Sequence, residues 1–410
     1  MSSAGATAPW PIGPVPSRRW IDACEGRSPG PTLVVIGGLH GNEPAGVVAI
    51  GRVLMELRRR GLETRLRGRV FGLVGNTRAL DHDVRYLDRD LNRAWAPTHF
   101  ERLKRQTRSE DSPEDAEQRE LMAAFEALER RYGALTLLDM HSFSAEGPPF
   151  CVAADALRNW PIASELRAPI IFGLDEIVEG SMLGYLVAQG HTGVGFEGGQ
   201  HEDPRTVENH VAALWRVLVG AGLLDARELD DASAHLRRLE QASAKLPQAV
   251  EIVYRHAIRP ADRFKMDPGF FNFQQVRRGQ RLAVQRGEEL GAPLGGRMLM
   301  PLYQGQGDDG FFLARDLDPR RMRLYAGLRR LELERLLPYL PGVALEGHGA
   351  EVLRMPKLAD RPAVRGALRM LGYRRELGGG GVELRLARQP QRPRGGRGSG
   401  QGSSNEGSEG

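Results

Sequence analysis

The sequence predicts an α/β protein with a mixed, mostly parallel sheet flanked by helices, followed by a second, smaller C-terminal β domain. Two patterns lead to this prediction. In the first half of the chain, apolar runs ending in glycine alternate with helical periodicity, an order typical of a parallel sheet covered by helices. After residue 250 the runs become short and are broken by glycine, which favours a small sandwich or barrel.

Three segments near the start carry the first pattern. Residues 32–38 contain a continuous apolar run bounded by glycine, which predicts a strand buried on both faces. Residues 45–60 space their apolar side chains for one helical face, and Gly61 provides a natural end. Residues 69–76 predict a second strand that ends in a polar turn.

The same alternation continues along the chain. We expect helices at 114–132 and 206–219, and a third buried strand at 134–140 that leads into His141. Shorter strands are expected at 149–153, 169–172 and 194–196.

Composition narrows the class of protein. The net charge is +5, from 57 Lys+Arg against 52 Asp+Glu, and part of the excess lies in an arginine-containing tail at 387–410. That tail is short and lacks aromatic residues, so we do not expect nucleic acid as a partner. Two cysteines cannot build a disulfide framework, which favours a reducing compartment. With no signal-like N-terminus and no 18-residue apolar run, we expect a cytoplasmic protein without a membrane span.

Candidate metal ligands follow the predicted strands. His40 and Glu43 come after the first strand, His141 after the third, and Glu197 after a later one. Open α/β sheets keep their ligand sites at the carboxyl ends of strands. Two histidines and one glutamate are a known catalytic zinc set that leaves a position for water. Glu197 is the candidate base that would take a proton from that water.

Four motifs in order carry a family resemblance: HGNE (40–43), RYLDRDLNR (85–93), DMH (139–141) and FEGG (196–199). Together they resemble the succinylglutamate desuccinylase/aspartoacylase family, a branch of the zinc-carboxypeptidase-like hydrolases. The resemblance covers residues 30–315. It implies one Zn²⁺ per chain, held by His40, Glu43 and His141, with Glu197 as the proton shuttle.

The resemblance also implies roles for residues that bind substrate. Arg85 would stabilise the oxyanion formed at the scissile carbonyl, and Asn92 with Arg93 would hold a substrate carboxylate, a role that suits the forked guanidinium. The stretch 298–312 resembles the part that narrows the entrance to the site in family members. Tyr303 is the candidate from that stretch for reaching the substrate.

One departure from the family concerns a second substrate carboxylate. Family enzymes that act on dicarboxylates use a further basic side chain shortly before the catalytic glutamate. Here His191 is the nearest candidate, and no arginine lies between Arg167 and Glu197. The partner of a second carboxylate is therefore unassigned.

Each candidate also has a structural interpretation. His40 could cap backbone groups, and Glu43 could be an acid favoured by the helix N-terminus; the four motifs together outweigh this. Asp139 could orient a zinc ligand or be a buried structural acid, with both alternatives open. For Asp90 we favour a structural role. Surface or structural roles are also favoured for His82, His99, His201 and His210.

These observations divide the chain into six expected segments. They are a flexible lead-in at 1–29, a zinc hydrolase catalytic domain at 30–225, a linker helix at 226–249, a small β domain covering the site at 250–315, a partly helical extension at 316–375, and a disordered Gly/Arg/Ser tail at 376–410.

The expected function is that of a deacylase: zinc-dependent hydrolysis of the amide bond of a small, carboxylate-bearing N-acyl amino acid. Two alternatives stay open. One is a zinc carboxypeptidase or amidase that acts on short peptides or cell-wall fragments, and the other is a non-catalytic binding protein of the same fold. The acyl group, the amine portion and the oligomeric state are not determined by the sequence.

Overall fold

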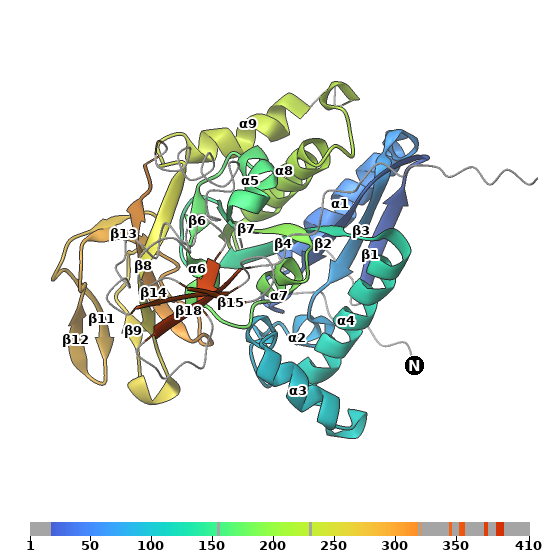
Figure 1. Cartoon of the computed structure of the whole chain (residues 1–410). Helices are drawn as coiled ribbons and strands as arrows, with labels where there is room; N and C mark the ends of the chain where they lie inside the picture. Colours follow the sequence, from blue (N-terminus) through green and yellow to red (C-terminus); the bar gives the residue numbers. More distant parts are fainter. Residues whose placement is uncertain are drawn as a thin grey trace, which may run out of the picture.

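The computed structural model describes residues 18–153, 156–228, 232–318 and 320, together with four short strands nearer the C-terminus. Its centre is an 11-stranded sheet in the order β1-β3-β2-β4-β7-β5-β6-β8-β14-β13-β10 (Figure 1). The strands are β1 (Trp20–Glu25), β2 (Ser28–Gly37), β3 (Arg67–Val74), β4 (Leu135–Phe143), β5 (Phe150–Val152), β6 (Ile170–Phe172), β7 (Thr192–Gln200), β8 (Ala249–Ala257), β10 (Gln275–Val276), β13 (Gly296–Leu299) and β14 (Asp309–Asp316).

The sheet is mixed, with a parallel core. Strands β3, β2, β4 and β7 pair in parallel, as do β5 with β6 and β6 with β8. Antiparallel pairs join β1 to β3, β5 to β7, and β8 to β14. The apolar run at 33–36 is fully buried, as expected for a central strand covered on both faces. The predicted α/β fold class is confirmed.

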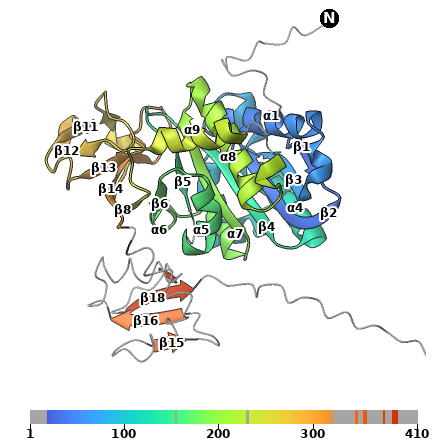
Figure 2. The ribbon, with the colours of Figure 1, turned by 90° about the horizontal axis from the view of Figure 1, so that it is seen from above.

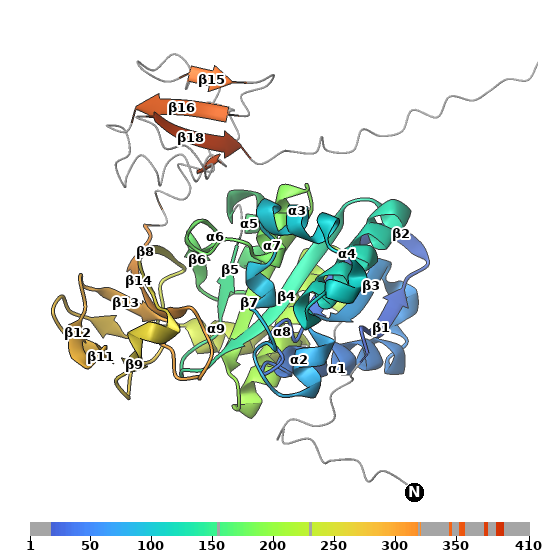
Figure 3. The ribbon, with the colours of Figure 1, turned by 90° about the horizontal axis from the view of Figure 1, so that it is seen from below.

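Helices cover both faces of the sheet. They are α1 (Ala45–Arg59), α2 (Thr77–Asp81), α3 (Pro97–Arg105), α4 (Pro113–Tyr132), α5 (Ala156–Glu165), α6 (Leu174–Ile177), α7 (Met182–Ala188), α8 (Pro204–Gly220) and α9 (Ala232–Ser243). Helices α1 and α8 pack on one face around a core that includes Ile50 and Leu214 (Figure 2). Helices α4 and α7 cover the other face around Phe125 and Leu186 (Figure 3).

The C-terminal β region is partly a continuation of the main sheet. Ile170 of β6 pairs with Ala249 of β8, so β8, β14, β13 and β10 extend the sheet without a break. A separate antiparallel sheet of β12 (Glu288–Gly291), β11 (Arg281–Gln285) and β9 (Lys265–Met266) corresponds to the small β unit that the sequence predicts. Its apolar core includes Leu282 and Phe311.

Two stretches differ from the expected segments. Strand β1 lies within the expected lead-in, because it pairs antiparallel with β3 and buries Cys24 in the core formed with α1. Four strands, in the order β15 (Ala344–Glu346), β16 (Val352–Pro356), β18 (Glu383–Arg388) and β17 (Tyr373–Arg375), form a sheet where we expect a partly helical extension and a disordered tail. The alternating sequence ELRLAR at 383–388 is typical of a strand. The rest of both stretches, and residues 1–17, lie outside the described residues.

Cys24 and Cys151 are both buried and free. Within the residues that the structure describes, no helix has the length and apolar content needed to cross a membrane.

Candidate active site

Strand register brings the predicted site residues together. Strand β2 ends at Gly37, and Gly38, with a φ of +65°, turns the chain into His40. In the parallel pair of β4 and β7, His141 lies directly opposite Glu197. Since the carboxyl ends of parallel strands meet at one edge of the sheet, all of these side chains gather there.

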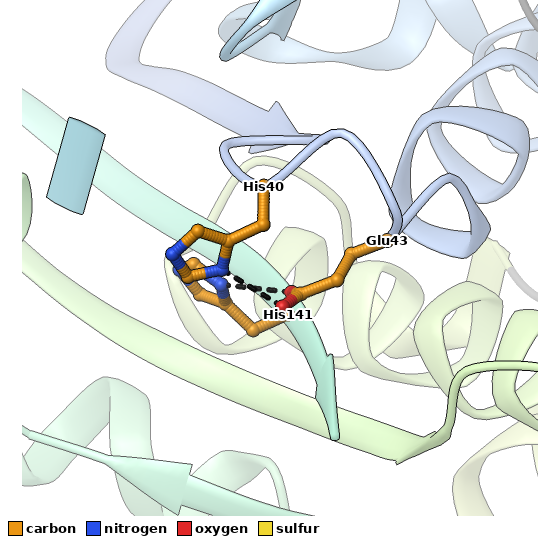
Figure 4. A group of neighbouring side chains, drawn as sticks. All are labelled: His40, Glu43 and His141. Atoms are coloured by element: carbon orange, nitrogen blue, oxygen red, sulfur yellow. Dashed lines mark hydrogen bonds and ion pairs between the residues drawn. The ribbon is translucent and has the colours of Figure 1, made fainter. Parts of the chain in front are cut away.

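His40, Glu43 and His141 converge on one point. Their candidate ligand atoms all lie within 4.8 Å of one another, and all three side chains are buried (Figure 4). Nδ1 of His40 is 2.8 Å from Oε1 of Glu43, and Nδ1 of His141 is 3.0 Å from Oε2. Two imidazole nitrogens and one carboxylate facing a common centre fit a single metal ion.

A second carboxylate orients each histidine. Nε2 of His40 lies 3.1 Å from Asp90, and Nε2 of His141 lies 3.0 Å from Asp139. A carboxylate that accepts the Nε2 proton leaves the Nδ1 lone pair directed at the metal position. The sequence leaves two roles open for Asp139, to orient a zinc ligand or to be a buried structural acid. Its contact with His141 favours the orienting role. Asp90, for which the sequence favours a structural role, makes the equivalent contact.

The electrostatics of the triad suit a bound cation. Burial raises the pKa of the Glu43 carboxyl, but the two histidines outweigh burial and hold this pKa well below its usual range. Burial lowers the pKa of His141, yet Asp139 and Glu43 outweigh it and raise this pKa well above its usual value. The triad therefore attracts positive charge to the space between its members.

Glu197 has the opposite character. Its Oε2 atom is buried and has no hydrogen-bond partner among the described residues. Burial, together with the negative charge of Glu43, raises its pKa to about 8, although His141 and Arg85 oppose the shift. A carboxyl group with such a pKa can accept and release a proton near neutral pH.

Arg85 lies beside the triad. One terminal nitrogen donates to Glu43 at 3.3 Å and the other to Asp90 at 3.0 Å. Its Nε atom is buried without a partner in the part of the chain that the structure describes. The guanidinium is thus held at the edge of the metal position by two carboxylates.

Asn92 and Arg93 form part of a short 3-10 helix, η2 (Leu91–Arg93), whose first turn is capped by Asp90. The Asp90 carboxylate accepts from the Asn92 backbone N–H at 2.8 Å. The side-chain oxygen of Asn92 accepts from the Met182 backbone N–H at 2.9 Å. Arg93 donates to Asp309 at 3.2 Å, so an acidic side chain of β14 already contacts the predicted carboxylate clamp.

These residues line one cavity of about 160 Å³. Its lining includes the predicted site residues His40, Glu43, Arg85, Asn92, Arg93, His141 and Glu197. Tyr303 is not among them, because its side chain is directed elsewhere: the hydroxyl donates to the Asp267 carbonyl at 2.8 Å and accepts from the Phe270 N–H at 2.9 Å. His191 is also outside the lining; it is buried and its Nδ1 accepts from the Leu135 N–H.

Sequence reasoning missed several residues of the site. Gln304 and Asp308 line the cavity from the loop before β14, and Asp309 lines it from the first position of that strand. The Gln304 side-chain oxygen accepts from Asn42 at 2.8 Å and lies 3.0 Å from Nε2 of His201. The paired aspartates in 298–312, the stretch already expected at the entrance, were the available signal.

Comparison with known proteins agrees with this geometry. Residues 29–208 match the model of the succinylglutamate desuccinylase/aspartoacylase catalytic domain. A succinylglutamate desuccinylase of Pseudomonas fluorescens (strain SBW25) is 39% identical over 75 residues, which is 18% of this chain and 22% of that relative. The matched stretch therefore spans about a fifth of the relative's length.

Solved structures show the same fold at low identity. The succinylglutamate desuccinylase/aspartoacylase from Rhodobacter sphaeroides superposes with a TM-score of 0.52 at 19% identity, covering 72% of this chain and 88% of that one. The product-bound ectoine utilization protein EutE (DoeB) from Ruegeria pomeroyi has a TM-score of 0.50 at 18% identity, covering 71% and 87%. Over residues 29–208, a little under half of its length, the chain is therefore similar to the catalytic domain of the succinylglutamate desuccinylase/aspartoacylase family.

Proposed function

We propose that the protein is a zinc-dependent hydrolase that cleaves the amide bond of a small N-acyl amino acid. One observation carries the proposal. Glu197, a carboxyl group with a pKa of about 8, lies in register with His141 of the buried triad, in a cavity that also contains Arg93. A proton acceptor, a set of metal ligands and a carboxylate-binding side chain in one cavity are the parts that such a reaction needs.

The residues fit zinc. His40, Glu43 and His141 would hold the ion, and three protein ligands leave one position open. When bound, zinc supplies a Lewis acid that polarises a carbonyl oxygen and lowers the pKa of a water molecule. Asp90 and Asp139 keep both imidazoles in the tautomer that can coordinate.

The side chains around the triad bind the substrate, stabilise the oxyanion and transfer the proton. Arg93 and the amide nitrogen of Asn92 bind the substrate carboxylate, and Arg85 donates to the carbonyl oxygen as negative charge develops there. Glu197 takes one proton from the attacking water and delivers it to the amide nitrogen as the C–N bond breaks. The products are a carboxylate from the acyl group and a free amino acid.

The cavity supports a small substrate over a peptide. Its volume of about 160 Å³ is below the range common for sites of larger ligands. The loop before β14 limits it through Met300, Leu302 and Gln304. The retention of the complete triad together with Glu197 also supports an enzyme over a non-catalytic binding protein.

Zinc analysis and a substrate screen test the proposal. Purified protein is assayed for bound metal and for release of free amino acid from acetyl, succinyl and longer N-acyl amino acids. Glu197→Gln is expected to keep zinc and lose activity by at least about a hundredfold, whereas Glu202→Gln, an exposed acid five residues away, serves as the matched control. Full activity of Glu197→Gln with zinc bound would contradict the assigned role.

A further inference from the structure

We infer that the amino-acid side chain of the substrate is uncharged and apolar, so that the carboxylate held by Arg93 is the substrate's only one. The inference rests on the proposed function and adds the class of amino acid. It depends on the composition of the cavity wall and on where that wall lies relative to Arg93.

The cavity wall beyond the catalytic groups is apolar. Its side chains come from β5, the segment 174–184 and β14, and they are Val152, Leu174, Val178, Leu183 and Phe312. Several of them belong to the adjoining apolar core, so the wall is backed by packed side chains rather than by water. Apolar surface of this kind favours an apolar group of the substrate.

Positive charge is scarce in the same cavity. Among the described residues that line it, the cationic side chains are Arg85 and Arg93. Arg85 is engaged by both Glu43 and Asp90, whereas Arg93 has one acidic partner, Asp309, so at most Arg93 is left to bind a substrate carboxylate. Asp308 and Asp309 add negative charge to the lining.

A second substrate carboxylate would therefore lack a partner. It would leave water, meet no arginine or lysine in the described lining beyond Arg85 and Arg93, and lie near acidic side chains. Burial of an unpaired carboxylate is strongly unfavourable. His191, the one basic candidate from the sequence, is outside the lining.

The apolar wall lies on the side of the carboxylate clamp. The Asn92 side chain contacts the backbone of Met182, the residue before Leu183. A Cβ atom at Gly180 would lie 2.4 Å from the Arg93 carbonyl oxygen, so the segment that carries Leu183 directly adjoins the clamp. The group that meets Leu183 is therefore on the same half of the substrate as the carboxylate, which is the amino-acid half.

The wall also adjoins the catalytic base. Gly195 precedes Glu197 by two residues, so both face the same side of β7. Gly195 pairs with Val152 of β5, and a Cβ at Gly195 would lie 3.6 Å from the Val152 Cβ and 3.8 Å from Leu183 Cδ2. Gly195 thus lies between the apolar side chains of Val152 and Leu183, two residues before the catalytic base.

Matched substrates test the inference on the zinc-loaded protein. N-acetyl-L-methionine and N-acetyl-L-glutamate have side chains of similar length and differ in charge. We expect kcat/KM to be at least about tenfold higher for the methionine compound. Equal or higher kcat/KM for the glutamate compound would overturn this inference and leave the proposed function intact. Failure to cleave any N-acyl amino acid would instead overturn the proposed function.

Two variants test the location of the wall. Leu183→Arg places a cation beside the clamp and is expected to move the preference toward the glutamate compound by about tenfold or more; Leu183→Met is the matched control and should keep the original order. Gly195→Ala adds one methyl group at ordinary contact distances and serves if Leu183→Arg does not fold. It should lower kcat/KM more for N-acetyl-L-phenylalanine than for N-acetyl-L-alanine. An equal change for both substrates, or no change of preference in a folded Leu183→Arg protein, would contradict the assignment.

Discussion

Arg93 donates to the carboxylate of Asp309 at 3.2 Å, across 216 residues of sequence. Asp309 also pairs with Arg255, so one carboxylate lies between two guanidinium groups. The candidate substrate clamp is thereby connected to β14, which lies far from it in the sequence. Under the proposed function, a substrate carboxylate would meet an arginine that already has an acidic neighbour.

Replacement of Asp309 by Asn should strengthen substrate binding. The amide keeps an oxygen that can accept from Arg93 but removes the competing negative charge. We expect KM for an N-acyl amino acid to fall by about three- to tenfold with little change in kcat. Steady-state kinetics measure this, with Asp316→Asn, at the other end of β14, as the control. A rise in KM would show that Asp309 instead holds Arg93 in its binding position.

Loss of the carboxylate behind His141 should weaken metal binding. In Asp139→Asn the group facing Nε2 is no longer charged, so the imidazole becomes a poorer ligand. We expect zinc affinity to fall by about 10- to 100-fold. Competition with a chromophoric chelator gives the dissociation constant. The exposed Asp88→Asn substitution should leave it unchanged, and an unchanged value for Asp139→Asn would exclude the orienting role.

The raised pKa of Glu197 predicts a pH-dependent stability of the metal-free protein. The folded state binds this proton more tightly than the unfolded chain, whose ordinary pKa is 4.5. Unfolding therefore releases a proton between these two values, and the stability contribution of Glu197 falls as the pH rises from about 4.5 to about 8. The Glu197→Gln substitution removes the titrating group, and with it this decrease in stability with rising pH.

Thermal unfolding of chelator-treated proteins measures the effect. The Gln variant should match the wild type at about pH 5 and exceed it in Tm at about pH 8, with Glu202→Gln behaving as the wild type throughout. A constant difference between Glu197→Gln and the wild type across that range would contradict a raised pKa.

Gly41 should be intolerant of any side chain. A Cβ at this position would lie 2.1 Å from the Ala79 carbonyl carbon, which is backbone and cannot move alone. Gly41→Ala is expected to shift the His40–Glu43 turn, abolish zinc binding and lower stability by about 2 kcal/mol or more. Gly51→Ala in α1 is the control, because its nearest atom would be 3.9 Å away. That change should stabilise the helix by about 0.5–1 kcal/mol. Retained zinc binding in Gly41→Ala would show that the turn can adapt.

Much of the fold and the metal-ligand geometry follows from local sequence. The run at 33–36 is apolar throughout because it is buried on both faces, and the glycines after it allow the turn that presents His40. His141 and Glu197 lie near the carboxyl ends of the parallel strands β4 and β7, so the parallel topology places them at one edge of the sheet. The two residues are 56 positions apart in the sequence, but each occupies the same position along its strand, so they lie opposite each other.

Contacts between remote segments could not be predicted in the same way. The Arg93–Asp309 pair depends on how β14 aligns with β8, which no local pattern specifies. Tyr303 lies in the stretch expected near the entrance, yet backbone groups at 267 and 270 determine where its hydroxyl points. The apolar character of Leu183 was visible in the sequence, but its position on the cavity wall depends on the packing of α7 against Gly193 and Gly195.

The continuity of the main sheet has a mechanical consequence. Because β6 pairs with β8, and β8 with β14, backbone hydrogen bonds join the strands on both sides of the cavity. A hinge between two rigid bodies would have to break that ladder, so the pairing opposes a large opening of the C-terminal β region. The loop between β13 and β14 is held differently: it contacts the rest of the cavity rim through side-chain hydrogen bonds such as that from Asn42 to Gln304, so under the proposed function this loop is where substrate would enter with the least disruption.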